Sequence, residues 1–300
     1  MRIFNNLLFQ DIRFSGISSI SRNILQKRKV TILVFHKPDS VFFEKAIGEL
    51  GKRYNIISFE DFISFQYEET DALPTNPLII TLDDGWKSNI DLLPVIKKHQ
   101  VPVTIFLMGG IINTMLHPWF SFLSDRREKE SLKRVSDSTR MSELKHKGFD
   151  QTLEFQERAI LNKEEIQEMQ SSGLITFGSH SLFHPILPKC NDAKAAKEIN
   201  LSKENIEAIT GSKCDLLSFP NGEYSERDIR LCQKAGYRAA VTLDVGFNKP
   251  GCDLFRLKRI SVPDQGSISE LLVKSSGFWA FVKTFLGRQK RTRRHAGLIE

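Results

Sequence analysis

The sequence predicts an α/β fold with a mainly parallel sheet. Short runs of apolar and β-branched residues, such as 29–36 and 77–82, show no polar alternation, as expected for strands buried on both faces. Segments with apolar residues at helical spacing lie between these runs. Strands that alternate with helices in this way form a parallel sheet covered by helices.

The expected elements follow one another without an internal repeat. Strands are expected at 29–36, 54–57, 77–83, 101–109, 174–180, 214–220, 238–245 and 254–262. Helices are expected at 40–54, 58–66, 89–100, 163–172, 193–210 and 225–237. Asn162 and Glu165 resemble a capping box at the start of the fourth of these helices, and Gly173 suits its end.

The alternation breaks between residues 111 and 160. This stretch is rich in charged residues and contains no clear strand, so we expect a helical insertion there. The chain then divides into three parts. Residues 1–28 form an N-terminal segment with amphipathic character, residues 29–265 form the α/β unit, and residues 266–300 form a basic and aromatic tail.

Composition narrows the class of protein. The chain has 300 residues, 40% of them hydrophobic, which is enough for a sizeable core, and a net charge of +7. Its four scattered cysteines do not resemble a disulfide framework. Polar residues interrupt the N-terminal apolar stretch, and no long apolar run follows, so neither a secretory signal nor a membrane-spanning helix is expected. These features predict a cytoplasmic protein.

Polar side chains follow several of the expected strands at the point where each strand ends. His36 ends the first strand, Asp83 and Asp84 end the third, and His180 and His184 lie at the end of the fifth. The stretch "FPNG" ends the sixth strand. Because the carboxyl ends of parallel strands meet at one edge of a sheet, we expect these groups to converge there.

Two histidines and one carboxylate form a typical metal-ligand set. Asp84, His180 and His184 could hold a divalent cation and leave positions open for water and substrate. The cation would also offset the repulsion between the adjacent carboxylates of Asp83 and Asp84. Asp83 could then act as a general base that accepts a proton from the attacking water.

Each motif taken alone has a simpler structural interpretation. An Asp-Asp-Gly at a strand end is often only a turn, and H-x-x-x-H pairs are commoner than metal sites. Pro185 directly follows His184, which favours a turn or short loop over a helix for this pair. The order of the motifs, each after a buried strand, is much more specific than any one of them.

Together the motifs resemble those of the polysaccharide deacetylase family, the NodB-homology domain of carbohydrate esterase family 4. The family motif T-F-D-D-G is similar to "TLDDG" at 81–85, and H-[ST]-x-x-H is similar to "HSLFH" at 180–184. The family motif P-x-G is similar to "PNG" at 220–222, and "VPVTIFL" at 101–107 resembles the family strand after the first motif. The resemblance covers roughly residues 30–262.

The resemblance implies a distorted (β/α) barrel of seven to eight mainly parallel strands and hydrolysis of an N-acetyl group on a sugar. It implies a divalent metal ion, most simply Zn²⁺, on Asp84, His180 and His184, with Asp83 as general base. The backbone N–H of Asn221 would help to hold the oxyanion. Pro220 and Gly222 would contribute to substrate binding.

Three features depart from the family pattern. The arginine that normally precedes the third motif and orients the catalytic base is missing, and only Lys213 lies upstream. The fourth motif has no convincing match, and the fifth motif's histidine, the usual general acid, is absent. His36 is a candidate for that role, although a hydrogen-bonded strand-end histidine is an equal alternative. Arg259, near the place of the missing histidine, has too high a pKa to donate a proton readily and is expected to bind substrate.

The expected partner is an N-acetylated glycan or a carrier-linked sugar, because a cytoplasmic enzyme does not readily reach finished polymer outside the cell. Phe278, Trp279 and Phe281 lie beside basic residues of the tail, which suits peripheral contact with the inner face of a membrane. No nucleic-acid-binding motif is present, and the oligomeric state stays open. Two alternatives remain: hydrolysis of another non-peptide C–N bond, and glycan binding without catalysis.

Overall fold

The computed structural model describes residues 2–68, 73–279 and 282. Its centre is a curled sheet of eight strands in the order β7-β6-β5-β4-β3-β1-β8, with β2 paired to β3, and every strand pair is parallel. The predicted parallel (β/α) barrel is therefore confirmed. The strands are β1 (Thr31–Phe35), β2 (Asn55–Ile56), β3 (Pro77–Leu82), β4 (Val103–Leu107), β5 (Ile175–Ser179), β6 (Leu216–Ser218), β7 (Ala239–Val241) and β8 (Ile260–Ser261).

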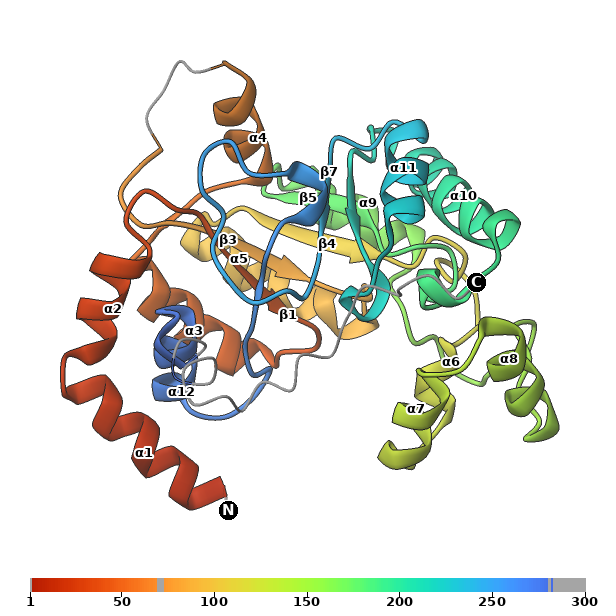
Figure 1. The fold of residues 1–300 in the computed structure, drawn as a ribbon, viewed down its shortest axis with the longest axis horizontal. Helices are drawn as coiled ribbons and strands as arrows, with labels where there is room; N and C mark the ends of the chain where they lie inside the picture. The colour runs from red at the N-terminus through yellow and green to blue at the C-terminus, as the bar shows by residue number, and fades with distance from the viewer. Residues whose placement is uncertain (1, 69–72, 280–281, 283–300) are drawn as a thin grey trace.

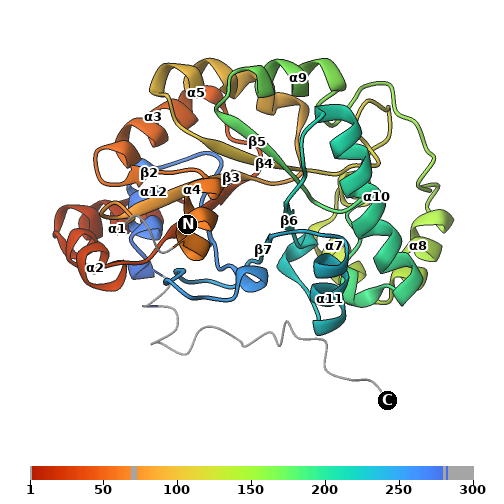
Figure 2. The same ribbon diagram turned by 90° about the horizontal axis from the view of Figure 1, so that it is seen from above.

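Helices cover the outside of the curled sheet. Figure 2 shows α3, α5, α9 and α10 as an arc around the strands. The predicted capping box of α9 is present: the Asn162 side chain accepts from the Glu165 N–H, and the Glu165 carboxylate accepts from the Asn162 N–H. The helices are α1 (Arg2–Phe14), α2 (Ile17–Leu25), α3 (Ser40–Gly51), α4 (Phe59–Glu68), α5 (Leu93–His99), α6 (Trp119–Phe122), α7 (Arg126–Leu132), α8 (Asp137–His146), α9 (Lys163–Ser171), α10 (Asp192–Thr210), α11 (Glu226–Lys234) and α12 (Ile268–Ser275).

The central strands are buried on both faces, as their continuous apolar sequences predict. Every residue of β1, β3 and β4 is buried. Successive residues point to opposite sides, so Leu33 and Phe35 join the apolar layer under the outer helices. Ile32 joins a second cluster, closed by Phe59 and Phe62 of α4. The two layers hold the strands in a fixed register.

The strand register places the carboxyl ends of the central strands along one edge. Phe35 pairs with Leu82, and Leu107 pairs with Ser179. The residues that follow these partners are His36, Asp83 and His180, so the predicted convergence of the strand ends is confirmed.

The predicted insertion is helical and has a small core of its own. Helices α6, α7 and α8 form a separate lobe beside the barrel (Figure 1). Trp119, Leu132, Leu144 and Phe149 are buried together within it. The fully buried Arg140 lies over the Trp119 ring, 5.0 Å from its centroid, and also pairs with an aspartate of the same helix. These contacts hold the lobe together, and Trp119 joins it to the edge of the sheet by donating from Nε1 to the His184 carbonyl.

Part of the expected tail belongs to the packed structure. Residues 268–275 form α12, which buries Leu271, Leu272 and Val273 and packs against α1 and α3. Trp279 contacts Phe9 of α1, with ring centroids 5.0 Å apart. The remaining tail residues on which the membrane prediction rests, including Phe281 and 283–300, lie outside the described residues. Among the described residues, no helix combines the length and apolar character that crossing a bilayer requires.

Candidate metal and catalytic site

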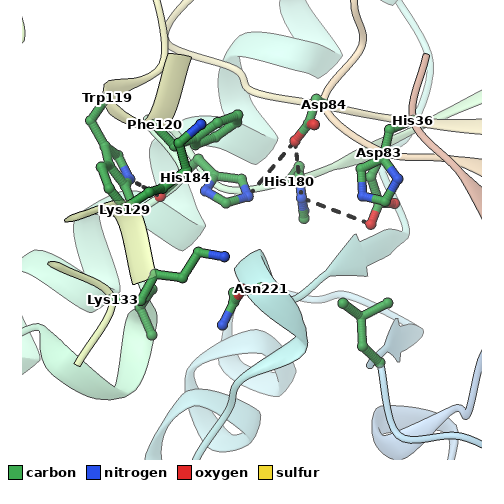
Figure 3. Close-up of a pocket in the computed structure, with 12 residues that line it drawn as sticks. His36, Asp83, Asp84, Trp119, Phe120, Lys129, Lys133, His180, His184 and Asn221 are labelled. Carbon is green, nitrogen blue, oxygen red and sulfur yellow. Dashed lines mark hydrogen bonds and ion pairs between the residues drawn. The ribbon is translucent and has the colours of Figure 1, made fainter. Parts of the chain in front are cut away.

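The structure brings Asp84, His180 and His184 together at the carboxyl edge of the sheet (Figure 3). One ligand atom from each residue lies within 4.8 Å of the others. Asp84 Oδ1 is 3.5 Å from His180 Nε2 and 3.7 Å from His184 Nε2. All three side chains are buried. Residues separated by about a hundred positions in the sequence therefore form one compact donor set.

The donor set fits a divalent cation. Ligand atoms that bind a tetrahedral zinc ion at about 2.1 Å lie roughly 3.4 Å apart, close to the two distances that Asp84 Oδ1 makes. Burial raises the pKa of Asp84, with a smaller contribution from Asp83 in the same direction. Burial and the neighbouring His180 hold the pKa of His184 well below its usual value, so its ring stays neutral, as metal binding requires. A cation would supply the positive charge that the buried Asp84 carboxylate lacks.

Surrounding hydrogen bonds orient the side chains of His180 and Asp84 and hold the backbone of His184. His180 Nδ1 donates to the carbonyl oxygen of Ser218 at 2.7 Å, which leaves the lone pair of Nε2 facing Asp84. Trp86 Nε1 donates to Asp84 Oδ2 at 3.0 Å, which leaves Oδ1 for the histidines. Trp119 Nε1 donates to the backbone carbonyl of His184 at 3.0 Å. Two of the three ligand side chains, those of His180 and Asp84, are thus oriented by hydrogen bonds before any cation binds.

The site loops hold four non-glycine residues in left-handed backbone conformations. Asp84 has φ 73°, Ser181 has φ 62°, and His184 and Asn221 each have φ 57°. Such conformations are unfavourable for residues with a Cβ atom and persist where surrounding contacts enforce them. Four of the eight such residues in the described chain lie in these loops, which is typical of a functional site.

Helix α10 holds the loop that carries both histidines. Glu198 Oε2 accepts from the backbone N–H of Phe183 at 2.8 Å. Ser202 Oγ donates to the Ser181 carbonyl at 2.9 Å, while Ser179 Oγ donates to Ser202 at 2.8 Å. Polar residues on the buried face of α10 therefore fix the backbone between His180 and His184.

Asp83, beside the donor set, is bound by an arginine from another strand. Arg259, directly before β8, donates from Nη1 to Asp83 Oδ1 and from Nη2 to Asp83 Oδ2, both at 2.7 Å. Its Nε donates to the Thr242 carbonyl at 2.8 Å, and Nη2 also donates to Ser218 Oγ at 2.9 Å. Burial raises the pKa of Asp83, but Arg259, with smaller contributions from His180 and His36, more than offsets this and holds it well below the usual range. Asp83 is therefore an ionised carboxylate in a fixed orientation.

The expected role of Arg259 in substrate binding does not agree with its position. The side chain is fully buried, lies behind Asp83 and does not line the pocket over the donor set. Arg259 instead performs the role expected of the missing third-motif arginine, because it orients Asp83, the expected catalytic base. Pro220 and Gly222, also expected to bind substrate, are buried and are not among the residues that line this pocket. Gly222 instead allows close packing, because a Cβ at its φ of +69° would lie 2.6 Å from Leu243 N.

A pocket of about 160 Å³ opens over the donor set. His36 and Asn221, two of the expected catalytic residues, line it together with Asp83. The insertion contributes four further side chains to this pocket, and the sequence did not single them out. Figure 3 shows these side chains on the side of the pocket away from His36 and Asp83. They are Trp119, Phe120, Lys129 and Lys133.

Comparison with known proteins agrees with this geometry. The family model described as polysaccharide deacetylase matches residues 70–240, more than half of the 300 residues. The chain belongs to the polysaccharide deacetylase family. Asp83, Asp84, His180, His184 and Asn221 all lie inside the matched range.

The individual relatives share little sequence identity with this chain. The protein YxkH of Bacillus subtilis is 24% identical over 62% of this chain and 51% of its own length. The poly-beta-1,6-N-acetyl-D-glucosamine N-deacetylase of Staphylococcus epidermidis is 24% identical over 74% of this chain and 66% of its own length. The chain thus spans about half to two thirds of these curated relatives. The deacetylase PplD of Streptococcus pyogenes, solved in complex with acetate, has the same fold, with a TM-score of 0.62 at 16% identity over 83% of this chain and 99% of PplD.

Proposed function

We propose that this protein is a metal-dependent hydrolase that removes an N-acetyl group from a sugar. The observation that carries the proposal is the buried donor set of Asp84, His180 and His184 beside Asp83, which Arg259 keeps ionised and oriented. A protein that only bound glycans would need neither a fixed base nor a ligand set next to it. Family membership supports the N-acetyl sugar as substrate class.

The chain's own residues would divide the work of hydrolysis. A divalent ion on Asp84, His180 and His184, with Zn²⁺ as the first candidate, would lower the pKa of the attacking water and polarise the acetyl carbonyl. Asp83 would accept the proton of that water as the new C–O bond forms. Asn221, whose left-handed backbone lies at the pocket, would donate its N–H to the developing oxyanion.

Cleavage of the C–N bond then needs a proton on the leaving nitrogen. The family's usual histidine is absent, and His36 lines the pocket on the side of Asp83 (Figure 3). We propose His36 as the group that supplies this proton. The products are acetate and a sugar amine, so the proton taken from water balances the proton delivered to nitrogen.

The insertion supports a substrate that carries negative charge. Lys129 and Lys133, four residues apart on one face of the α7 region, both line the pocket. Asp83 and Asp84 are the acidic residues among those lining it, and the first is already paired with Arg259. Lys133 forms an ion pair with Glu130 at 2.8 Å, so Lys129 would be the main cation that faces the substrate, and a phosphate next to the acetamido sugar would complement it. A carrier-linked sugar, attached through phosphate to a nucleotide or a lipid, has this chemistry.

Acetate release tests both parts of the proposal. The zinc-loaded full chain is incubated with a nucleotide-diphosphate N-acetylhexosamine, a polyprenyl-diphosphate N-acetylhexosamine and a neutral N-acetylated oligosaccharide. We expect release from a phosphate-linked sugar, and none from Asp83→Asn. The double variant Lys129→Ala/Lys133→Ala should raise KM for that substrate at least tenfold with kcat nearly unchanged.

Arg126→Ala/Arg127→Ala is the matched control. These arginines belong to the same helix but line a separate surface depression, so KM should not change. Preferential turnover of the neutral oligosaccharide, with no effect of the lysine variant, would leave the hydrolase standing and remove the phosphate-linked substrate. No acetate from any of the three sugars would turn attention to hydrolysis of another C–N bond on the same fold.

A further inference from the structure

Large apolar side chains are exposed together on the two N-terminal helices. Eight large hydrophobic residues of the described chain are exposed, and six of them belong to α1, α2 or the turn between these helices. Phe14 is 77% exposed, Ile24 is 67% and Ile20 is 59%. The other three are Leu7, Leu8 and Ile17. Exposed large apolar side chains concentrated on two successive helices in this way indicate a contact site rather than ordinary surface variation.

Helix α2 exposes its apolar side chains and buries its polar ones, the opposite of a helix that packs on a hydrophobic core. Ile17, Ile20 and Ile24 follow helical spacing and lie on its exposed side. Ser18 and Ser21 are buried, and Ser21 Oγ donates to the Ser276 carbonyl at 3.1 Å. Gln26, directly after the helix, is fully buried and donates to the Ser275 carbonyl. Polar residues thus anchor α2 to the end of α12, and its isoleucines face outward.

The segment that carries these apolar side chains is basic, although one of its arginines, Arg13, pairs with Glu49 at 3.2 Å. Residues 1–29 contain six basic residues and one acidic residue, Asp11. Lys27 and Arg28 follow the end of α2 and are exposed. Exposed apolar residues flanked by basic residues are the pattern of a helix that lies in the interface of a bilayer with anionic lipids.

We propose that α1 and α2 form a docking surface for an anionic lipid bilayer. The outward side chains of Phe14, Ile17, Ile20 and Ile24 enter the boundary between headgroups and acyl chains. Lys27 and Arg28 pair with lipid phosphates. A second copy of the chain is the poorer occupant, because two surfaces with the same excess of positive charge repel each other.

The docking surface lies away from the catalytic pocket. In both ribbon views α1 and α2 lie on the opposite side of the barrel from α7, whose Lys129 lines the pocket (Figures 1 and 2). Bilayer contact through α1 and α2 therefore leaves the pocket uncovered. The proposal depends on none of the pocket residues, so binding and hydrolysis can be measured separately.

Vesicle flotation of the full chain tests the docking surface. Vesicles of phosphatidylcholine with 30% phosphatidylglycerol are compared with pure phosphatidylcholine, at low and high salt. The test variant is Ile17→Ser/Ile20→Ser/Ile24→Ser, and Val41→Ser/Val245→Ser is the matched control, because it replaces exposed valines elsewhere. Circular dichroism confirms that each variant is folded, and size-exclusion chromatography with light scattering gives its mass.

We expect the wild type and the valine control to float with the anionic vesicles, and binding of the isoleucine variant to be at least tenfold weaker. Lys27→Glu/Arg28→Glu should lower binding and its salt dependence, while hydrolysis of a soluble substrate stays unchanged for every variant. Equal flotation of the isoleucine variant and the wild type would assign binding to another segment and overturn the proposal. A wild-type dimer that becomes a monomer in the isoleucine variant, without flotation, would overturn it in favour of self-association.

Discussion

The pairing of Arg259 with Asp83 gives the sharpest prediction about the site. The substitution Arg259→Met keeps similar bulk but removes the cation and all the hydrogen bonds that the guanidinium makes to Asp83, Ser218 and Thr242. Both residues are buried, so the variant leaves an uncompensated carboxylate inside the barrel. Breaking a buried pair in this way costs about 3–5 kcal/mol of unfolding free energy.

The same substitution should change the pH dependence of catalysis. In the wild type, the pKa of Asp83 is low and the base is ionised throughout the working range. Without Arg259, burial, the largest single effect on this group, would raise that pKa, so the ionised fraction of Asp83 would increase with pH over a higher range than in the wild type. We expect acetate release by Arg259→Met at pH 7 to fall by about 100-fold or more, the typical contribution of a general base, and to recover partly toward pH 9.

Urea unfolding and a pH–rate profile measure the two effects. Arg256→Met is the control, because Arg256 is a half-buried arginine near the same strand whose ion pairs with Asp253 and Glu226 lie at the surface. The double variant Asp83→Asn/Arg259→Met should recover stability relative to Arg259→Met, because no charge is then left unpaired, while activity stays lost. An Arg259→Met protein within about 1 kcal/mol of wild-type stability and with an unchanged pH–rate profile would refute the reasoning.

Three further predictions follow from individual contacts. Burial raises the pKa of Glu198 to about 7, so the folded state binds its proton more tightly than the unfolded state. Stability should therefore fall between about pH 4.5 and 7, by up to about 3 kcal/mol, and urea unfolding of Glu198→Gln should lack this fall. His36→Gln should reduce turnover at least tenfold without loss of bound metal, whereas turnover close to wild type would remove His36 from the mechanism. Gly222→Ala should lower the melting temperature and the activity together, because its Cβ would collide with Leu243 at the pocket; an unchanged melting temperature would contradict this.

The sequence was sufficient for the parts of the fold that depend on local pattern. Strands such as β1 and β3 are continuous apolar runs, and the Asn162–Glu165 capping box is a three-residue signal. The ligands were predictable for a related reason. Each follows a buried strand, and parallel strands bring their carboxyl ends to one edge whatever their separation in the sequence.

Contacts that depend on tertiary packing were not predictable. Arg259 reaches Asp83 from a strand that follows it by 176 positions, and nothing in "LKRISV" distinguishes a buried arginine from an exposed one. Lys129 and Lys133 lie in a charged stretch whose position over the pocket is set by the small core around Trp119. The reversal of α2 was likewise hidden, because the hydrophobic pattern gives the apolar face of a helix but not the direction that face points.

Metal content of the purified full chain tests the central claim most directly. Mass spectrometry of the wild type, prepared with added zinc and then dialysed, is compared with His180→Ala and with His99→Ala as a control histidine outside the donor set. The account predicts near one divalent ion per chain in the wild type and the control, and loss of that ion in His180→Ala. A wild type that stays metal-free after exposure to zinc and other divalent ions would contradict the claim that Asp84, His180 and His184 form a metal site.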